Sequence, residues 1–309
     1  MAAGMAAAGQ PPGYVVDDEA FRALVVAADP PRRLHTGLTW AEGPVYRPAT
    51  DDLLFSDVPG DTMWRWSATA GAEVYRRPSQ FANGSTLDQQ GRVVTCEQGT
   101  RRIARTEPYG SVVGVVGHFG GARLNSPNDV VVRSDGTIWF SDPDYGILSN
   151  EQGYQAESEL GHCYVFRFDP RQGRLSVVAD DLVKPNGLAF SVDETVLYVT
   201  DSAVTHDPDG PHHIRAYDVV DHATLVNSRV VAVVEPGWPD GLRVDAQDHL
   251  WVSSGEGIQC YTPDGRLLGR IRLPEIAANC EFGGPDRNQL FITATSSLYL
   301  APLRVAGAR

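Results

Sequence analysis

The sequence predicts an all-β protein, specifically a six-bladed β-propeller with a short N-terminal helical extension. Three observations support this fold class. A hairpin-like unit recurs six times along the chain. Segments rich in β-branched and aromatic residues alternate with turns, and 31 glycines and 21 prolines supply the many chain reversals. A chain of 309 residues also suits a single all-β domain. We therefore expect an extension over residues 1–30 and a propeller over residues 31–309.

The N-terminal extension is predicted to hold a flexible lead-in and one short helix. Residues 1–13 are rich in Ala, Gly and Pro, and they lack the basic start and apolar core of a secretory signal. A helical pattern then runs from Asp17 to Ala28, with an aspartate as its cap and two prolines after it. The following segment, Arg33 to Thr39, is expected to close the ring by pairing with the last blade.

The clearest copy of the repeat is the stretch from Asn125 to Gly146. Two apolar runs flank a tight Ser-Asp-Gly turn, which is typical of a β-hairpin. Asn128 precedes the first strand and Asp142 ends the second. Because a hairpin returns the chain to its starting edge, these two side chains should lie at the same edge of the sheet.

The other copies share this register, and each begins at what we call a key residue. In five copies a polar residue ends the second strand 14 or 15 positions later, and successive key residues are 40 to 58 positions apart. Two more strand-like segments follow each hairpin, which gives four strands per blade. A parallel β-helix is the main alternative, but its period would be shorter and more regular. The key residues are Glu42, Asn83, Asn128, Asn186, Asp240 and Cys280.

Two blades are longer than the rest because of insertions at residues 147–161 and 203–213. Both insertions follow a second strand, so they should project from the same face as the key residues. The second insertion contains His206, His212 and His213 among Asp, Pro and Gly residues. We interpret it as a solvated loop, with contact to a substrate as the alternative.

The key residues are predicted to ring one mouth of the central channel, because the first strand of every blade lines that channel. Glu42 is a poor turn former, and Glu42 and Asp240 facing each other would repel strongly without a cation between them. Amide and carboxylate oxygens suit a hard divalent cation. Such an ion would polarise a carbonyl or phosphoryl oxygen, and Asp240 could serve as general base. The Asn residues are also good turn formers, so a structural role stays open for each.

The residues that end the second strands lie at the same face by the hairpin argument. Turn capping and solvation are their expected roles. Asp201, beside the second insertion, is the one that we assign to substrate binding. No residue pattern supports a Ser-His-Asp triad.

Charge and cysteine content limit the classes of partner. The formal net charge of −13 disfavours nucleic acid and anionic membranes, and no apolar run is long enough to span a bilayer. The four cysteines show no metal-binding spacing, so free buried thiols and a cytoplasmic location are expected. We therefore expect a monomer or small homo-oligomer that acts on a small molecule.

Four motifs stand at the entrances of blades: WAEGP (Trp40–Pro44), LNSPNDVVVRSDGTIWFSDPDYGI (Leu124–Ile147), KPNGLAFS (Lys184–Ser191) and WPDGLRVD (Trp238–Asp245). They resemble the gluconolactonase/regucalcin (senescence marker protein) family, and most closely its bacterial gluconolactonase branch. The resemblance extends from about Pro30 to the end of the chain. It implies a six-bladed propeller that hydrolyses sugar lactones with a divalent cation at one channel mouth. Calcium, zinc and magnesium are associated with such proteins, and manganese is a further possibility.

Carried over by motif, the resemblance implies the roles of individual residues. Glu42, Asn186 and Asp240 would bind the metal, Asn128 would contact metal or substrate, and Asp240 would also act as the base. We add Asn83 as a substrate-binding residue. The resemblance and the key residues together imply a metal-dependent lactonase with one divalent ion, for which we expect Ca²⁺, and with D-glucono-1,5-lactone as its default substrate.

Two alternatives stay open on the sequence alone. The same site would also polarise a P=O group in an organophosphate hydrolase. A non-catalytic binding propeller stabilised by the ion is the other.

Overall fold

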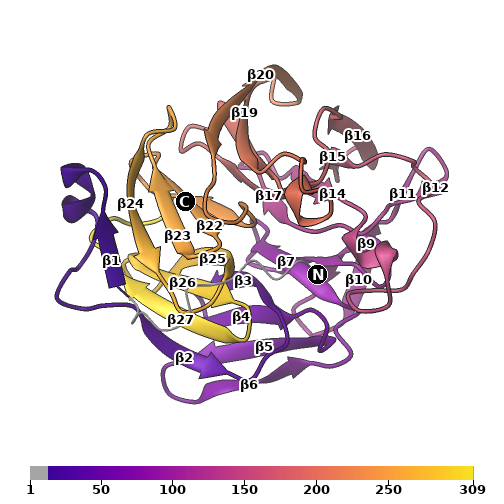
Figure 1. Ribbon diagram of the computed structural model, residues 1–309. Coiled ribbons are helices and arrows are strands. Elements are labelled where there is room, and N and C mark those ends of the chain that lie inside the picture. The colour runs from indigo at the N-terminus through magenta and orange to yellow at the C-terminus, as the bar shows by residue number, and fades with distance from the viewer. Residues whose placement is uncertain (1–12, 309) are drawn as a thin grey trace.

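The computed structural model describes residues 13–308, which form six antiparallel sheets of four or five strands arranged as blades around a central axis (Figure 1). Within each of the first five blades the strands follow chain order from the axis outward. The first blade is β3 (Ala41–Arg47), β4 (Asp52–Asp57), β5 (Thr62–Ser67) and β6 (Gly71–Arg76). The second is β7 (Ala82–Leu87), β8 (Val93–Glu97), β9 (Arg102–Thr106) and β10 (Val112–Val116). The third is β13 (Val130–Val132), β14 (Ile138–Asp142), β15 (Tyr164–Asp169) and β16 (Arg174–Ala179).

The remaining blades complete the ring. The fourth is β17 (Pro185–Phe190), β18 (Val196–Asp201), β19 (His213–Val220) and β20 (Thr224–Val233). The fifth is β21 (Leu242–Val244), β22 (Leu250–Ser254), β23 (Gly257–Tyr261) and β24 (Leu267–Arg272). The sixth combines β25 (Ala277–Gly283), β26 (Gln289–Ala294) and β27 (Ser297–Pro302) with β2 (Arg32–Thr36) as its outer strand. The predicted closure is therefore confirmed, since β2 pairs antiparallel with β27 from the other end of the chain.

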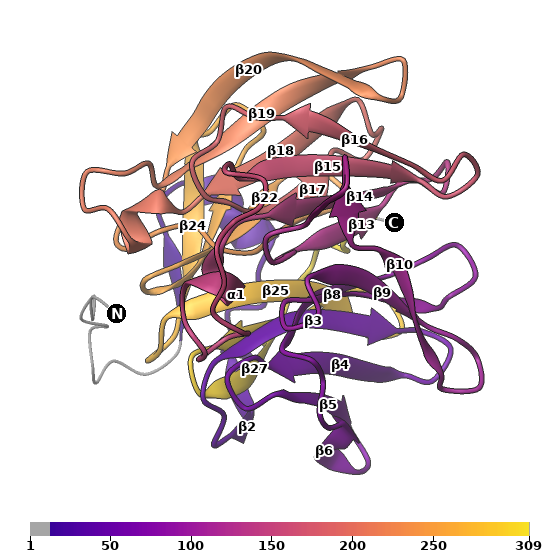
Figure 2. The ribbon, with the colours of Figure 1, turned by 90° about the vertical axis from the view of Figure 1, so that its right-hand side faces the viewer.

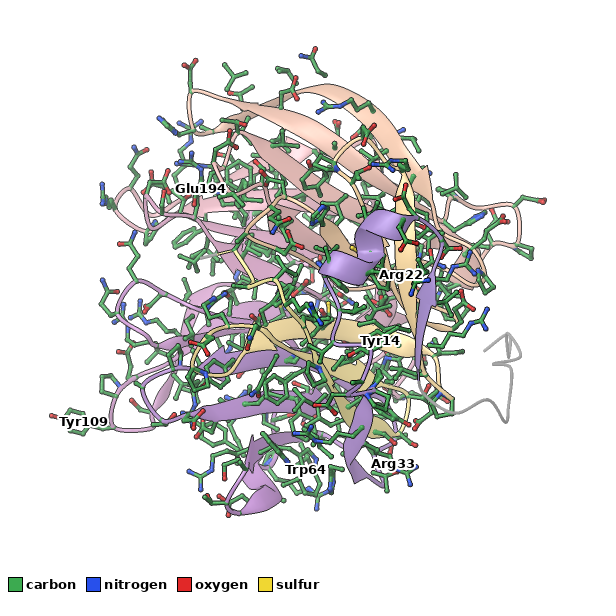
Figure 3. All side chains as sticks on the ribbon, turned by 90° about the vertical axis from the view of Figure 1, so that its left-hand side faces the viewer. Tyr14, Arg22, Arg33, Trp64, Tyr109 and Glu194 are labelled. Carbon is green, nitrogen blue, oxygen red and sulfur yellow. The ribbon has the colours of Figure 1, made fainter. Side chains whose placement is uncertain are left out.

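The N-terminal extension differs from the predicted helix. Its helical part is one 3-10 segment, η1 (Glu19–Ala23), and the strand β1 (Gly13–Val16) precedes it. Asp18 caps η1 by accepting the backbone N–H of Ala20 at 2.9 Å. The longer helix over Asp17–Ala28 was wrong because β1 pairs with β24 as a fifth strand of the fifth blade, and the chain must stay close to that edge. Figure 3 shows this region on the outside of the ring, with Tyr14 and Arg22 labelled.

The hydrophobic core is divided among the contacts between neighbouring blades. Six clusters of buried apolar side chains occupy the six blade interfaces of residues 13–308. In one of them Phe21 of the extension, fully buried, packs against Trp251 between the fifth and sixth blades. Each Å² of apolar surface buried at these interfaces stabilises the fold by about 25 cal/mol. A single blade cannot bury its own two faces, so the ring depends on contacts between neighbouring blades.

Both insertions lie at one end of the channel, as predicted. The first contains α1 (Tyr145–Leu148) and the second contains η2 (Ala203–Thr205). In Figure 2, α1 and the segment after β18 lie on the left of the ribbon, where β3 begins, whereas the labelled C-terminus lies on the right. A short hairpin, β11 (His118–Phe119) paired with β12 (Ala122–Arg123), lies in the connection between the second and third blades. No helix among residues 13–308 is long and apolar enough to cross a membrane.

Candidate active site

Backbone hydrogen bonds join the inner strands of neighbouring blades where these strands begin at the channel mouth. In the second, fourth and fifth blades, the residue after the key position donates its backbone N–H to the carbonyl at the key position of the next blade. In the first and third blades the corresponding N–H groups, of Gly43 and Asp129, donate to side-chain oxygens instead. Gly84 donates to Asn128 at 2.8 Å, and Gly187 donates to Asp240 at 3.2 Å. This contact places the key residues of adjacent blades beside each other around one mouth.

The same contact corrects the sixth key residue. Gly241 donates to the carbonyl of Ala278 at 2.7 Å, so Ala278 occupies the ring position that we had given to Cys280. Cys280 pairs with Ile292 further along the blade, and its thiol faces the Trp251 carbonyl at 3.5 Å in the core between the fifth and sixth blades. The register shift in β25 is not the cause, because β3, β7 and β17 contain the same shift at the equivalent place. The counting failed because the sixth hairpin is longer: Ala278 precedes Ala294, the end of β26, by 294 − 278 = 16 positions, whereas 14 or 15 were expected.

Glu42 and Asp240 are the two acidic members of the ring, and both are buried. Burial is the main cause that raises the pKa of Glu42, to about 7. Burial also raises the pKa of Asp240 well above its usual range, and the charge of Glu42 adds to that effect. Glu42 Oε2 accepts the backbone N–H of Gly43 at 2.9 Å and the side-chain amide of Asn279 at 3.3 Å. Two carboxylates that interact in this way strongly favour a cation or a shared proton.

Three amides complete the polar side of the ring. The Asn186 side chain is hydrogen-bonded to Asp240 and lowers its pKa in opposition to burial. Asn83 Oδ1 is buried and has no hydrogen-bond partner among the described residues. Asn128 is buried beside Asp129, with its backbone N–H donated to Ser141 at 3.0 Å. The ring therefore has an uncompensated oxygen acceptor as well as two close carboxylates, and both features suit a hard cation.

Three strand-end aspartates fix the turns that lead to key residues. Asp201 accepts the backbone N–H groups of Val183 and Lys184 at 2.8 and 2.9 Å, just before Asn186. Asp142 accepts those of Asn125 and Ser126 before Asn128, and Asp57 accepts those of Thr39 and Trp40 before Glu42. These contacts make the three carboxylates positioning groups. For Asp201, the predicted substrate contact finds no support in this bonding.

Below the ring lies a layer of charged side chains that the sequence reasoning missed. The buried guanidinium of Arg243 lies 3.4 Å from Asp129 Oδ2 and donates to Glu281 Oε2 at 2.9 Å. Arg243 and Glu281 also line a cavity of about 270 Å³ near the other end of the channel. A signal was available: the residue after the key residue is Gly in four blades, but it is Asp129 in the third and Asn279 in the sixth.

The oxygen donors at this mouth fit a hard divalent cation better than a soft metal ion. Across residues 13–308, no group of three or more His, Cys, Asp or Glu side chains is placed to hold a metal ion. Glu42 and Asp240 would therefore need amide oxygens as further ligands, and Asn186 already contacts Asp240. All-oxygen donor sets of this kind suit Ca²⁺, Mg²⁺ or Mn²⁺.

Comparisons with known proteins agree with the fold and the motifs. A gluconolactonase from Zymomonas mobilis is 31% identical over 295 residues, which cover 89% of this chain and 82% of that protein. The pentonolactonase XacC of Haloferax volcanii is 27% identical, with 85% and 84% covered. The solved structure of a gluconolactonase from Xanthomonas campestris superposes with a TM-score of 0.88 at 38% identity, covering 96% of each chain. Residues 40–296 match the SMP-30/Gluconolactonase/LRE-like region, and the chain belongs to that family.

Proposed function

We propose that the chain is a lactonase that opens sugar lactones at the mouth ringed by Glu42, Asn83, Asn128, Asn186 and Asp240, with one divalent cation bound there. The observation that carries the proposal is the convergence of Glu42 and Asp240, two buried carboxylates with raised pKa values, on one channel mouth. The names of the gluconolactonase and pentonolactonase relatives support the substrate class.

Glu42, Asn186 and Asp240 are assigned to hold the cation, and Asn128 completes the set. When bound, the cation would withdraw electron density from the lactone carbonyl and neutralise part of the charge of the two carboxylates. Of the candidates Ca²⁺, Mg²⁺, Mn²⁺ and Zn²⁺, the oxygen donors favour Ca²⁺ or another hard ion.

Asp240 is assigned as the group that moves the proton. Its carboxylate takes a proton from the attacking water as the water oxygen bonds to the carbonyl carbon. The bond between that carbon and the ring oxygen then breaks, and Asp240 returns the proton to the departing oxygen. Asn186 keeps Asp240 oriented through their hydrogen bond. Asn83 and Asn128 are assigned to bind the lactone: the unpartnered Oδ1 of Asn83 would accept a lactone hydroxyl, and the Asn128 amide N–H would donate to a lactone oxygen.

The test is a lactone panel with the metal-stripped protein. D-Glucono-1,5-lactone and five-carbon lactones would be assayed with Ca²⁺, Mg²⁺, Mn²⁺ or Zn²⁺ restored separately, and spontaneous hydrolysis in buffer subtracted. We expect activity to return with one or more ions and to fall by about a thousandfold or more in Asp240→Asn. Faster turnover of paraoxon than of every lactone would overturn the substrate class, and wild-type rates in Asp240→Asn would overturn the assigned base.

A cytoplasmic location is part of the same proposal. The four cysteines Cys96, Cys163, Cys260 and Cys280 are all free and buried, as is usual for proteins of reducing compartments. Retention of all four thiols in protein purified without a reducing agent would be consistent with it, and a periplasmic signal in cell fractionation would contradict it.

A further inference from the structure

Tyr145 carries a phenol that the rest of the chain does not satisfy. Its oxygen is shielded from solvent and has no hydrogen-bond partner among the described residues. Two other buried phenols are partnered: Tyr217 donates to Asp181 at 2.7 Å and Tyr299 donates to Glu275 at 2.6 Å. A buried hydroxyl without a partner costs free energy, and where it lies beside a binding site a ligand can supply the missing bond.

The phenol lies at the same mouth as the proposed reaction. Tyr145 begins α1, three residues after the Asp142 cap of the third blade. Burial raises the pKa of Tyr145, and the charge of Asp240 is the next cause of that rise. The phenol is therefore a neutral donor that lies within reach of the Asp240 charge. The Thr205 side chain opposes that rise as a hydrogen-bonding neighbour of the phenol. The two hydroxyls do not reach hydrogen-bonding geometry, and the Thr205 hydroxyl donates to the Ser202 carbonyl at 2.7 Å.

Two side chains contact the ring of Tyr145. Lys184 Nζ lies 5.5 Å from the ring centroid, and Lys184 is itself paired with Asp144. The imidazole of His206, from the second insertion, packs against the ring at a centroid distance of 5.3 Å. The two insertions thus meet at Tyr145, and the phenol is fixed before any ligand arrives, which lowers the entropic cost of using it.

The chemistry of a sugar lactone supplies the missing partner. An aldonolactone carries a hydroxyl on the carbon next to its carbonyl, whereas a plain lactone of the same ring size has only hydrogen there. A carbonyl held near Asp240 therefore brings hydroxyl oxygens into the region of the phenol. A site built to bond a substrate hydroxyl discriminates strongly against the analogue that lacks it, because its own polar group is then left unpaired.

We propose that Tyr145 is a specificity residue whose phenol donates a hydrogen bond to a ring hydroxyl of the sugar lactone. The proposal rests on the function proposed above. It predicts that the preference for hydroxylated over plain lactones is set by Tyr145, with Lys184 and His206 as the side chains that hold it.

The experiment compares Tyr145→Phe with the wild-type protein on D-glucono-1,5-lactone and on δ-valerolactone, each with the activating metal present. We expect kcat/KM for the sugar lactone to fall by 10- to 100-fold, about 1.4 to 2.7 kcal/mol, and kcat/KM for δ-valerolactone to change by less than threefold. Competitive inhibition by 1,5-anhydro-D-glucitol, which has the ring hydroxyls but no carbonyl, should weaken by a similar factor.

Tyr164→Phe is the matched control, since Tyr164 is in the same blade and its ring packs against His162. We expect Tyr164→Phe to leave kcat/KM unchanged for both lactones. Thermal unfolding establishes that Tyr145→Phe is folded, and its Tm should be equal to or above that of the wild type because an unpartnered hydroxyl is removed. Equal losses on both lactones, or no loss on either, would overturn the proposal. If the wild type opens no lactone faster than buffer, the proposed function fails instead, whatever the variant does.

Discussion

At the residue scale, Glu42 and Asp240 are two buried carboxyl groups whose negative charges repel each other. Each is buried, and the negative charge of Glu42 raises the pKa of Asp240 further. A carboxyl whose folded pKa is raised lowers the stability of the fold as the pH rises from its unfolded pKa through its folded pKa. The site is therefore a local source of instability in the metal-free protein, and a divalent cation would convert it into a source of stability.

The first prediction concerns Glu42→Gln in the metal-free protein. At pH 8 we expect the Tm of the metal-free variant to exceed that of the metal-free wild type, because one of two repelling charges is removed. Adding Ca²⁺ should raise the Tm of the wild type but not that of the variant. Glu281→Gln is the control: this carboxylate pairs with Arg243 at 2.9 Å, so its loss should lower the Tm. A lower Tm for metal-free Glu42→Gln would contradict the argument.

The second prediction is a pH dependence from Asp142. Burial is the main cause that raises its pKa to about 7, whereas an unfolded aspartate titrates near 3.9. The stability that this shift contributes is complete below about pH 4 and is lost as the pH rises through 7. Part of the wild-type decrease in Tm between pH 5 and pH 8 should thus be absent in Asp142→Asn.

The substitution also removes a carboxylate cap, which should lower the Tm at every pH. Asp57→Asn removes the equivalent cap from the first blade and measures that cost separately. An unchanged difference in Tm between pH 5 and pH 8 in Asp142→Asn would show that Asp142 is not responsible for the pH effect.

At the element scale, glycine allows the inner strands to approach each other at the mouth. A Cβ on Gly187 would lie 2.4 Å from the Asp240 carbonyl oxygen and 2.7 Å from the Gly241 Cα. A Cβ on Gly84 would lie 2.6 Å from the Asn128 carbonyl oxygen. These are backbone atoms that cannot rotate away, so a larger residue must separate the blades.

The third prediction follows for Gly187→Ala. Displacement of the fifth blade should move Asp240 away from Glu42, and we expect the Kd for the activating metal to rise about tenfold together with a lower Tm. Gly173→Ala is the matched control, because a Cβ there meets nothing within 4 Å. Gly173 has a φ of +62°, so its replacement should cost about 1 kcal/mol of stability without a change in metal affinity. Equal metal affinities in the two variants would contradict the claim that a Cβ at residue 187 moves Asp240 away from Glu42.

At the scale of the whole molecule, the ring is closed by strands from opposite ends of the chain. β2 supplies the outer strand of the sixth blade, and the side chains of β25 to β27 pack against the first blade on one side and the fifth on the other. Each blade interface buries apolar side chains, so an open ring would expose two of them.

The fourth prediction compares two truncated chains. A chain that begins at residue 29 loses β1 and η1 with Phe21, and we expect a lower Tm but one cooperative unfolding transition. A chain that begins at residue 38 also loses β2 and leaves the β27 edge unpaired, and we expect aggregation or loss of the cooperative transition. Circular dichroism and calorimetry distinguish these outcomes. Identical transitions in both chains would show that β2 is not needed for closure.

Local pattern determined most of the architecture. Hairpin turns and alternating apolar residues are short-range features, so the six blades, the closing strand and the face of the insertions could be predicted from the order of residues alone. The spacing also predicted where five of the six inner strands begin. It failed for the sixth, because Ala278 lies 294 − 278 = 16 positions before the end of β26 and is not a polar residue that would mark the key position.

The charged layer and the unpartnered phenol depended on tertiary structure. Arg243 and Asp129 are 114 residues apart, and Tyr145 meets His206 only because two insertions from different blades converge. Composition and spacing determined that acids and amides repeat at blade entrances. Only the packing of the blades decided which of them are buried together, and burial is what makes two carboxylates need a cation and a hydroxyl need a partner.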